Sequence, residues 1–243
     1  MANVLVLAQV WLWDKFVGAV TEEDDGRITF EYDEAFRRSG LEISPRKLPL
    51  SLRGPVSFPE LNRVDAFAGL PGVLADALPD RFGNAIIKAY FENLGQPDNA
   101  MSPVQKLLYM GKRSMGALEF RPATRGRANA HERQPLEIAD LVEQARKLIE
   151  GETAAAVAEI MQVGSSAGGA RPKAVILWNR KKDEVRSGFA APKPGDEHWI
   201  IKFDGVGELD APNPASQPYN RIEYVYSLIA KDAGIEMGET HLL

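Results

Sequence analysis

The chain has 243 residues, no cysteine, 44% hydrophobic and 26% charged residues, and a formal net charge of -5 at pH 7. The length suits one large domain or two small ones, and the absence of cysteine excludes disulfides, thiolate nucleophiles and cysteine-ligated zinc. No basic block indicates direct nucleic-acid binding, and no run reaches the roughly 18 apolar residues of a membrane span, so we expect a soluble, cytoplasmic protein.

The first 60 residues are predicted to begin with a small sheet. Residues 3–20 form an apolar and aromatic run, and residues 22–32 contain an Asp-Gly turn signal followed by a second such run. This pattern predicts a hairpin or a short meander. Residues 36–59 are richer in Pro, Ser and Arg, and we expect irregular structure there with short extended pieces such as residues 47–52.

Helical patterns follow. Residues 74–95 have helical periodicity that is broken once, at Pro79. Residues 102–122 predict a short helix, a glycine-containing turn and a strand. Together with the preceding sheet, these elements predict a mixed α and β subdomain.

The middle of the chain contains a candidate linker. Residues 121–133 are polar and basic and lack large apolar side chains, so they predict a linker, with an ordinary surface loop as the alternative. Residues 135–151 begin at a proline, end at a glycine and carry one apolar face, which predicts a helix. Residues 153–162 predict a second, shorter helix.

The last third of the chain predicts two strands and a helix. The strand candidates are "KAVILWN" (residues 173–179) and "HWIIKFD" (residues 198–204). A charged turn and a Pro/Gly-containing loop are expected between them. Residues 219–234 then predict a helix that ends at Gly234.

A glycine- and serine-rich loop stands directly before the first of these strands, in "VGSSAGGARPKAVILWN" (residues 163–179). Glycines let backbone N–H groups approach a phosphate closely, so the loop suits a phosphate site. Gly164 and Gly169 have the spacing of the P-loop glycines, but Ala170-Arg171 stands where that motif requires Lys-Ser/Thr. A flexible hairpin connection is the alternative.

A lysine and a glutamate follow this loop in an informative order. Lys202 lies inside an apolar strand, where a lysine either extends to solvent from an edge strand or is held by an anion. Glu223 lies on the helix that follows. A glycine-rich loop, a strand lysine and a helix glutamate, in this order, are the parts of a protein-kinase N-lobe. A solvent-facing glutamate is the alternative for Glu223.

Several longer motifs resemble one protein family. The segments "LPDRFG" (residues 78–83), "GKRSMGAL" (111–118), "SSAGGARPKAVI" (165–176), "HWIIKFD" (198–204) and "NRIEYVYSLIAKDAGIEM" (220–237) are similar to motifs of the HipA family. HipA proteins are serine/threonine kinases and the toxins of bacterial toxin-antitoxin modules. The resemblance covers nearly all of the chain.

The resemblance implies roles for individual residues. Ser166 matches the loop serine that the family autophosphorylates, with Ser165 as a neighbouring alternative, and Glu223 matches the ion-pair partner of the ATP lysine. Arg171 is a further candidate for a phosphate contact. The residues expected to bind ATP are Ala167, Gly168, Gly169, Lys173 and Lys202. The histidines are scattered and receive no catalytic or metal role.

The chain also departs from the family pattern, because HipA proteins are considerably longer. Their C-terminal lobe carries the catalytic aspartate and the residues that hold magnesium. We therefore expect no catalytic residue and no metal ligand in these 243 residues, and no kinase activity from this chain alone. A fragment of a longer gene product is the favoured explanation, with a truncated gene or a separately encoded half as alternatives.

These observations predict an α+β protein with two parts. Residues 1–125 would form the HipA N-terminal subdomain, and residues 134–243 an incomplete kinase-like N-lobe without its C-terminal catalytic lobe. In a full-length context the resemblance implies transfer of the ATP γ-phosphate to a protein hydroxyl, with magnesium as cofactor.

The resemblance also implies partners. It predicts a protein substrate such as an aminoacyl-tRNA synthetase or a translation factor. It further predicts neutralisation by a HipB-like antitoxin, and contact with DNA only through that antitoxin. A non-catalytic binding module and a small-molecule kinase are the competing functions.

Overall fold

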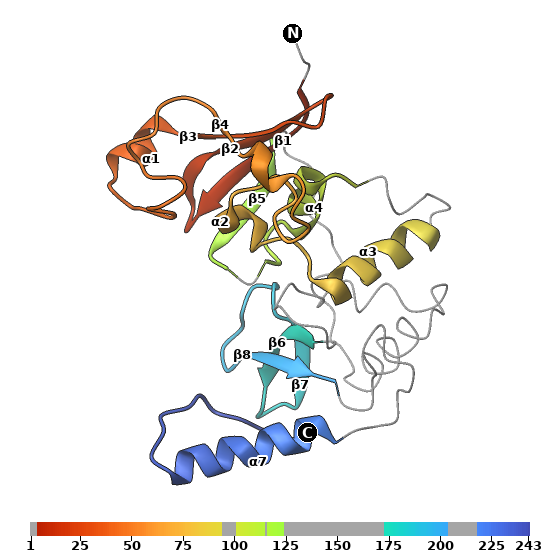
Figure 1. Cartoon of the computed structure of the whole chain (residues 1–243). Helices are drawn as coiled ribbons and strands as arrows, with labels where there is room; N and C mark the ends of the chain where they lie inside the picture. Colours follow the sequence, from red (N-terminus) through yellow and green to blue (C-terminus); the bar gives the residue numbers. More distant parts are fainter. Residues whose placement is uncertain (1–3, 94–100, 115, 124–172, 204–217) are drawn as a thin grey trace. The chain divides into compact units, whose positions relative to one another are not determined.

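The computed structural model describes residues 4–93, 101–114, 116–123, 173–203 and 218–243. The chain divides into two compact units (Figure 1). Among the described residues, the first unit contains residues 4–84, 101–114 and 116–123, and the second contains residues 85–93, 173–203 and 218–243. Each unit is described by itself.

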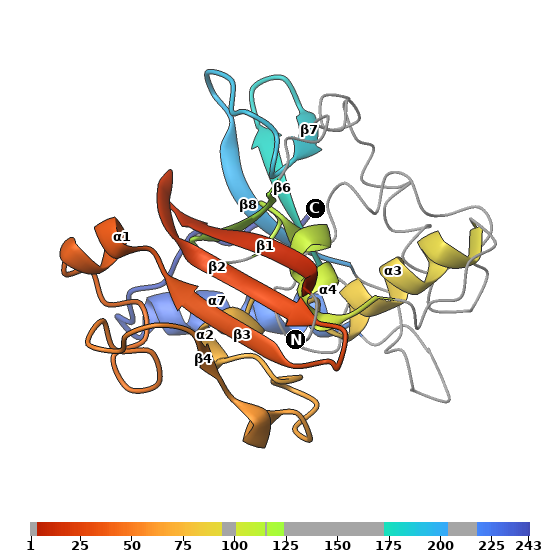
Figure 2. The same cartoon turned by 90° about the horizontal axis from the view of Figure 1, so that it is seen from above.

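The first unit is built on a five-stranded antiparallel sheet. Its strands are β1 (Val4–Leu12), β2 (Lys15–Glu23), β3 (Ile28–Tyr32), β4 (Val56–Ser57) and β5 (Leu118–Pro122). The order across the sheet is β4-β3-β2-β1-β5, and Figure 2 shows β3, β2 and β1 side by side. The predicted N-terminal meander is therefore confirmed, and β5 joins the free edge of β1.

A glycine allows two of these strands to approach each other. The pairing of β1 with β2 slips between Val10 and Trp11, opposite the segment that contains Gly18. A Cβ atom at Gly18 would lie 2.1 Å from the carbonyl oxygen of Glu31 on β3. Any larger residue would push β2 and β3 apart, so glycine is required at this bulge.

Short helices complete the first unit: α1 (Glu34–Arg38), the 3-10 turn η1 (Pro59–Leu61), α2 (Gly72–Ala75) and α4 (Pro103–Met110). A longer helix, α3 (Arg81–Asn93), begins in this unit. The predicted helical segment around Pro79 is thus two helices, because proline interrupts the helical hydrogen bonds there.

The start of α4 is encoded by a capping box. The Ser102 hydroxyl accepts a hydrogen bond from the Gln105 N–H, and the Gln105 side chain accepts one from the Ser102 N–H. Pro103 occupies the first helical position, where its missing N–H costs nothing. The cap fixes the apolar face of α4 against β1, β2 and β5.

One hydrophobic core lies between this sheet and its helices. Its fully buried members come from the strands, from the segments after α1 and from α4, and include Ala8, Val10, Val17, Val20, Phe30, Leu48, Leu70, Leu74, Val104 and Leu107. The Tyr32 hydroxyl donates to the Leu48 carbonyl at 2.8 Å. Leu48 is buried in this core, and residues 47–52 form turns and bends in place of the extended piece predicted from the sequence.

The second unit contains a three-stranded antiparallel sheet of order β7-β6-β8. Its strands are β6 (Lys173–Asn179), β7 (Glu184–Ser187) and β8 (Glu197–Lys202), and α7 (Tyr219–Asp232) follows. Gly234 ends α7 with a φ of 79°, and the Ile235 N–H donates to the Ala230 carbonyl at 2.9 Å.

The predicted strands β6 and β8 and the helix α7 are confirmed, as are the charged turn at residues 180–183 and the loop at residues 188–196. The prediction missed strand β7, which Glu184–Ser187 form beside β6 between that turn and that loop. The candidate linker from residue 124 onward and the helices predicted at 135–151 and 153–162 lie outside the described residues. In the described part of the chain, no helix combines the length and apolar composition needed to cross a membrane.

Candidate functional site

Two lysines face each other across the second sheet. In the antiparallel pairing of β6 with β8, Lys173 lies directly opposite Lys202. Opposed residues of such a pair project from the same face of the sheet, and like charges in these positions destabilise the pairing unless a negative group lies near them. Lys173 is buried, with 7% of its surface exposed. The arrangement concentrates positive charge at one end of the strands.

Lys202 is paired with a carboxylate from α7. Its Nζ atom forms an ion pair and hydrogen bond with the Glu223 carboxylate. Both side chains are about half exposed, at 45% and 48%. An ion pair so accessible to water contributes at most about 1 kcal/mol to stability. The contact therefore matters more for where it holds the ammonium group than for the stability of the unit.

The same helix makes a second contact with the same lysine. Asn220, three residues before Glu223, donates a hydrogen bond from Nδ2 to the Lys202 carbonyl oxygen at 2.9 Å. Sequence reasoning missed Asn220. A usable signal existed, because residues three apart lie on the same helix face.

Farther along, α7 is held by the C-terminal segment. Ser227 is the buried residue of the helix, and its hydroxyl lies 2.8 Å from the Thr240 hydroxyl. Lys231 donates to the same Thr240 hydroxyl at 3.3 Å. The ring of His241 packs against Trp178, with ring centroids 5.1 Å apart.

Strand β7 carries a buried ion pair that the sequence did not reveal. Arg186 pairs with Asp196, and their side chains are only 4% and 3% exposed. The Asp196 carboxylate also accepts the Lys193 N–H at 2.7 Å and the Asn179 amide at 3.2 Å. The Lys193 backbone hydrogen bond, supported by Asn179 and Arg186, lowers the pKa of Asp196. This network ties the loop before β8 to the sheet.

A second charged group lies on the neighbouring part of the sheet. Arg180 donates to Glu197 at 2.9 Å and to Glu239 at 2.6 Å, and its guanidinium lies 5.6 Å from the Trp199 ring centroid. The hydrogen bond from Arg180 lowers the pKa of Glu197. These contacts connect β6, β8 and the C-terminal segment.

The remaining predicted site residues are Ser165, Ser166, Ala167, Gly168, Gly169 and Arg171, and all of them lie outside the described residues. The structure thus brings together Lys173, Lys202 and Glu223, three residues that the sequence singled out.

Comparison with known families covers both units. A family model described as the HipA N-terminal domain matches residues 8–121, and one described as the HipA-like C-terminal domain matches residues 165–243. This chain belongs to the HipA family. Among curated proteins, a search found no match to it.

In this HipA family chain, the second match includes both lysines and Glu223. Lysine binds phosphate as a compact point charge, so two lysines at opposed positions form a candidate site for an anion. Within the described residues, no group of three or more His, Asp or Glu side chains has an arrangement that could hold a metal ion.

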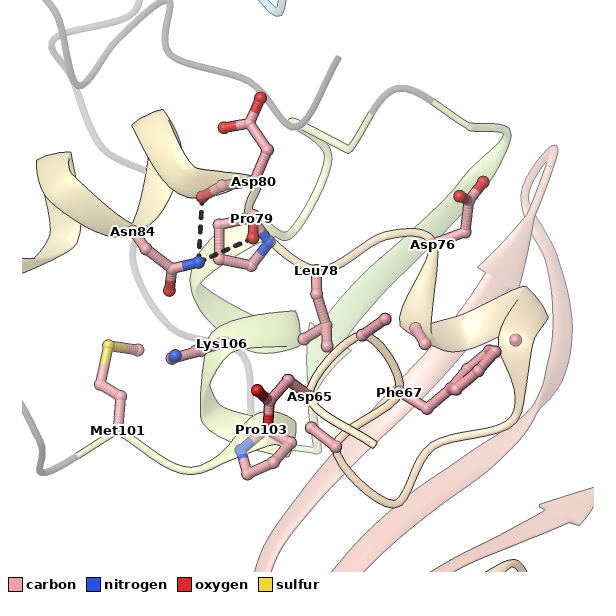
Figure 3. A pocket seen from close by; sticks show the side chains of 14 residues that line it. Asp65, Phe67, Asp76, Leu78, Pro79, Asp80, Asn84, Met101, Pro103 and Lys106 are labelled. Carbon is pink, nitrogen blue, oxygen red and sulfur yellow. Dashed lines mark hydrogen bonds between the residues drawn. The ribbon is translucent and has the colours of Figure 1, made fainter. Parts of the chain in front are cut away.

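The first unit of the HipA chain contains a cavity of about 460 Å³ (Figure 3). It lies beside the "LPDRFG" motif, and its lining includes Asp65, Phe67, Leu78, Asp80 and Lys106. In the motif, the Asp80 carboxylate accepts the Gly83 N–H at 2.8 Å at the start of α3. The motif thus forms the beginning of helix α3. None of the described residues predicted to bind ATP lines the cavity.

Proposed function

We propose that this chain forms the nucleotide-binding part of a HipA-type serine/threonine kinase. The observation that carries the proposal is the geometry of Lys202, which faces Lys173 across β6 and β8 and pairs with Glu223 on α7. A strand lysine paired with a helix glutamate is the arrangement that holds the α- and β-phosphates in protein kinases. Membership of the HipA family supports the same reading.

Each residue has a distinct part in the proposal. Lys202 would contact phosphate oxygens through Nζ, while Glu223 fixes the direction in which that ammonium group points. Lys173 would add a second positive charge from the facing strand. The backbone of Ala167, Gly168 and Gly169 would supply N–H donors, which a loop without bulky side chains allows. Bound ATP would supply the phosphoryl group.

The acceptor in this proposal is a serine or threonine hydroxyl of a protein. The carboxylates that orient the hydroxyl and hold magnesium would come from a C-terminal lobe. Ser166 would be the site of self-phosphorylation, which adds about -1.5 to -2 charges beside the phosphate loop and should lower ATP affinity. A HipB-like antitoxin, with DNA contacted through it, and an aminoacyl-tRNA synthetase substrate belong to the same proposal by family membership.

The binding part of the proposal is tested with a non-hydrolysable ATP analogue and magnesium in isothermal titration calorimetry. Loss of one charge-assisted contact should weaken binding about 10- to 100-fold in Lys202→Ala and in Lys173→Ala. Lys181→Ala is the matched control, because this exposed lysine in the turn after β6 carries the same charge away from the facing pair. Equal affinities in all four proteins would refute the assignment of Lys202.

Phosphotransfer requires a separate measurement on a protein that includes a C-terminal catalytic lobe. Intact mass after incubation with magnesium and ATP, followed by phosphosite mapping, should show one added phosphate at Ser166 and none in Ser166→Ala. Nucleotide binding without any added phosphate would favour the alternative, a non-catalytic binding module. Transfer to a small metabolite without protein phosphorylation would favour the small-molecule kinase.

A further inference from the structure

We propose that Asn220 is a positioning residue that locks α7 to strand β8 and thereby keeps Glu223 in contact with Lys202. This inference rests on the proposed function for its consequence in nucleotide binding, but its structural part stands on the contacts of α7 alone. The hydrogen bond from Asn220 Nδ2 to the Lys202 carbonyl oxygen is 2.9 Å long.

Asn220 and Glu223 bind the same residue, Lys202, at two points. Asn220 binds the backbone of Lys202 and Glu223 binds its side chain. Because the two residues are one helical turn apart, the pair fixes both the distance of α7 from β8 and its rotation about its own axis. With one contact alone, the first half of α7 would be attached to Lys202 at a single point.

The N-cap residue of α7 supplies no side-chain cap. Pro218 occupies the N-cap position, and it makes no side-chain hydrogen bond to the first turn. A helix beginning without a capping side chain depends more on contacts made by its first turn. Asn220 lies in that turn, so its hydrogen bond attaches the helix at its uncapped end.

Apolar burial does little to hold α7 in place. The residues Ile222, Val225, Tyr226 and Ile229 are 45%, 51%, 67% and 54% exposed. The face toward the sheet and the C-terminal segment instead carries Asn220, Glu223 and Ser227, which make polar contacts. A helix attached through a few hydrogen bonds can change position when one is lost, unlike a helix packed into a core.

Loss of the Asn220 contact should therefore let the first turn of α7 pivot. Farther along the helix, the contact of Ser227 with Thr240 would be retained and would act as the pivot. Glu223 lies between the two attachment points and would move away from Lys202. The Lys202 ammonium group would then no longer be held in one direction toward a phosphate.

The absence of cysteine makes the test specific, because spin labels attach only at introduced cysteines. Lys181→Cys in the turn after β6 and Arg221→Cys in α7 are both exposed positions. Pulsed electron–electron double resonance between the two spin labels should give one narrow distance distribution. Asn220→Ala should broaden it. Asn220→Gln, which keeps the amide donor, should restore part of the narrow distribution, whereas Asn220→Asp should not.

Ile222→Ala is the matched control, since it shortens an exposed side chain in the same turn without touching Lys202. It should leave the distance distribution unchanged. Titration with the non-hydrolysable ATP analogue should show affinity about fivefold lower in Asn220→Ala, as expected for one neutral hydrogen bond.

The outcomes separate the two proposals. An unchanged distance distribution in Asn220→Ala would overturn the positioning role, regardless of the affinity measured for the ATP analogue. A broadened distribution in a protein whose wild-type form binds no analogue would support the positioning of Glu223 and overturn the proposed function. Broadening with unchanged analogue affinity would overturn the link between α7 and the phosphate lysine.

Discussion

Removing the guanidinium group of Arg186 should destabilise the second unit by about 3 kcal/mol. Arg186→Met keeps much of the side-chain volume but leaves the Asp196 carboxylate without its charged partner. Both side chains are almost completely buried, and breaking a buried ion pair by removing one partner costs about 3–5 kcal/mol. Asp196 keeps the Lys193 N–H and the Asn179 amide as donors, which favours the lower end of that range.

Hydrogen exchange detected by mass spectrometry measures this loss locally. A change of about 3 kcal/mol corresponds to roughly 100-fold faster exchange of the β6 and β7 amides. Arg180→Met is the control, because Arg180 is 39% exposed in its ion pairs and should change stability by about 1 kcal/mol or less. The double variant Arg186→Met/Asp196→Leu should recover much of the stability, since an apolar pair can replace a buried ion pair. Exchange within about threefold of wild type in Arg186→Met would refute the reasoning.

Three further predictions concern single groups. Asp196 has a folded-state pKa below its ordinary value of 3.8 because of the Lys193 backbone hydrogen bond, with Asn179 and Arg186. Its stabilising effect is therefore complete above about pH 4 and is lost as the pH falls through the pKa of the folded state. Acid unfolding, followed by tryptophan fluorescence, should then depend less steeply on pH in Asp196→Asn than in the wild type. Burial, with the nearby Glu42 charge, raises the pKa of Tyr32 to about 12. The stabilisation from its protonated form is present below about pH 10 and lost as the pH rises toward 12, and a spectrophotometric titration should show one tyrosine ionising late, absent in Tyr32→Phe. Ser102→Ala removes the cap of α4 and should lower the stability of the first unit by about 1 kcal/mol in urea denaturation, with Ser51→Ala at an exposed turn position as control.

The sequence was most informative where local chemistry decides the structure. Strand β6 was predicted with its observed bounds, because an apolar run between a loop and a charged turn leaves few alternatives. Gly234 ends α7 as expected, since its positive φ suits glycine. Lys202 and Glu223 were identified as a pair from their order in the chain, and they are in contact.

Sequence patterns did not predict the contacts between residues that are far apart in the chain. Strand β7 was missed because Arg186 in its middle makes the segment look exposed, and the partner that allows its burial, Asp196, lies ten residues further on in a loop. The register that places Lys173 opposite Lys202 depends on how β6 and β8 pair, and a shift of one residue would have separated them onto opposite faces. The position of Asn220 on the helix face of Glu223 could be predicted from their spacing, but its partner is a backbone carbonyl, which every residue has, so the sequence did not identify the contact.

The outward face of α7 has a consequence for how the protein behaves in solution. Its exposed isoleucine, valine and tyrosine side chains form one stripe on the helix surface, where water must be organised around apolar groups. Salts such as sulfate make that hydration less favourable. Such salts should therefore favour association of the second unit through this stripe while both sheets remain folded.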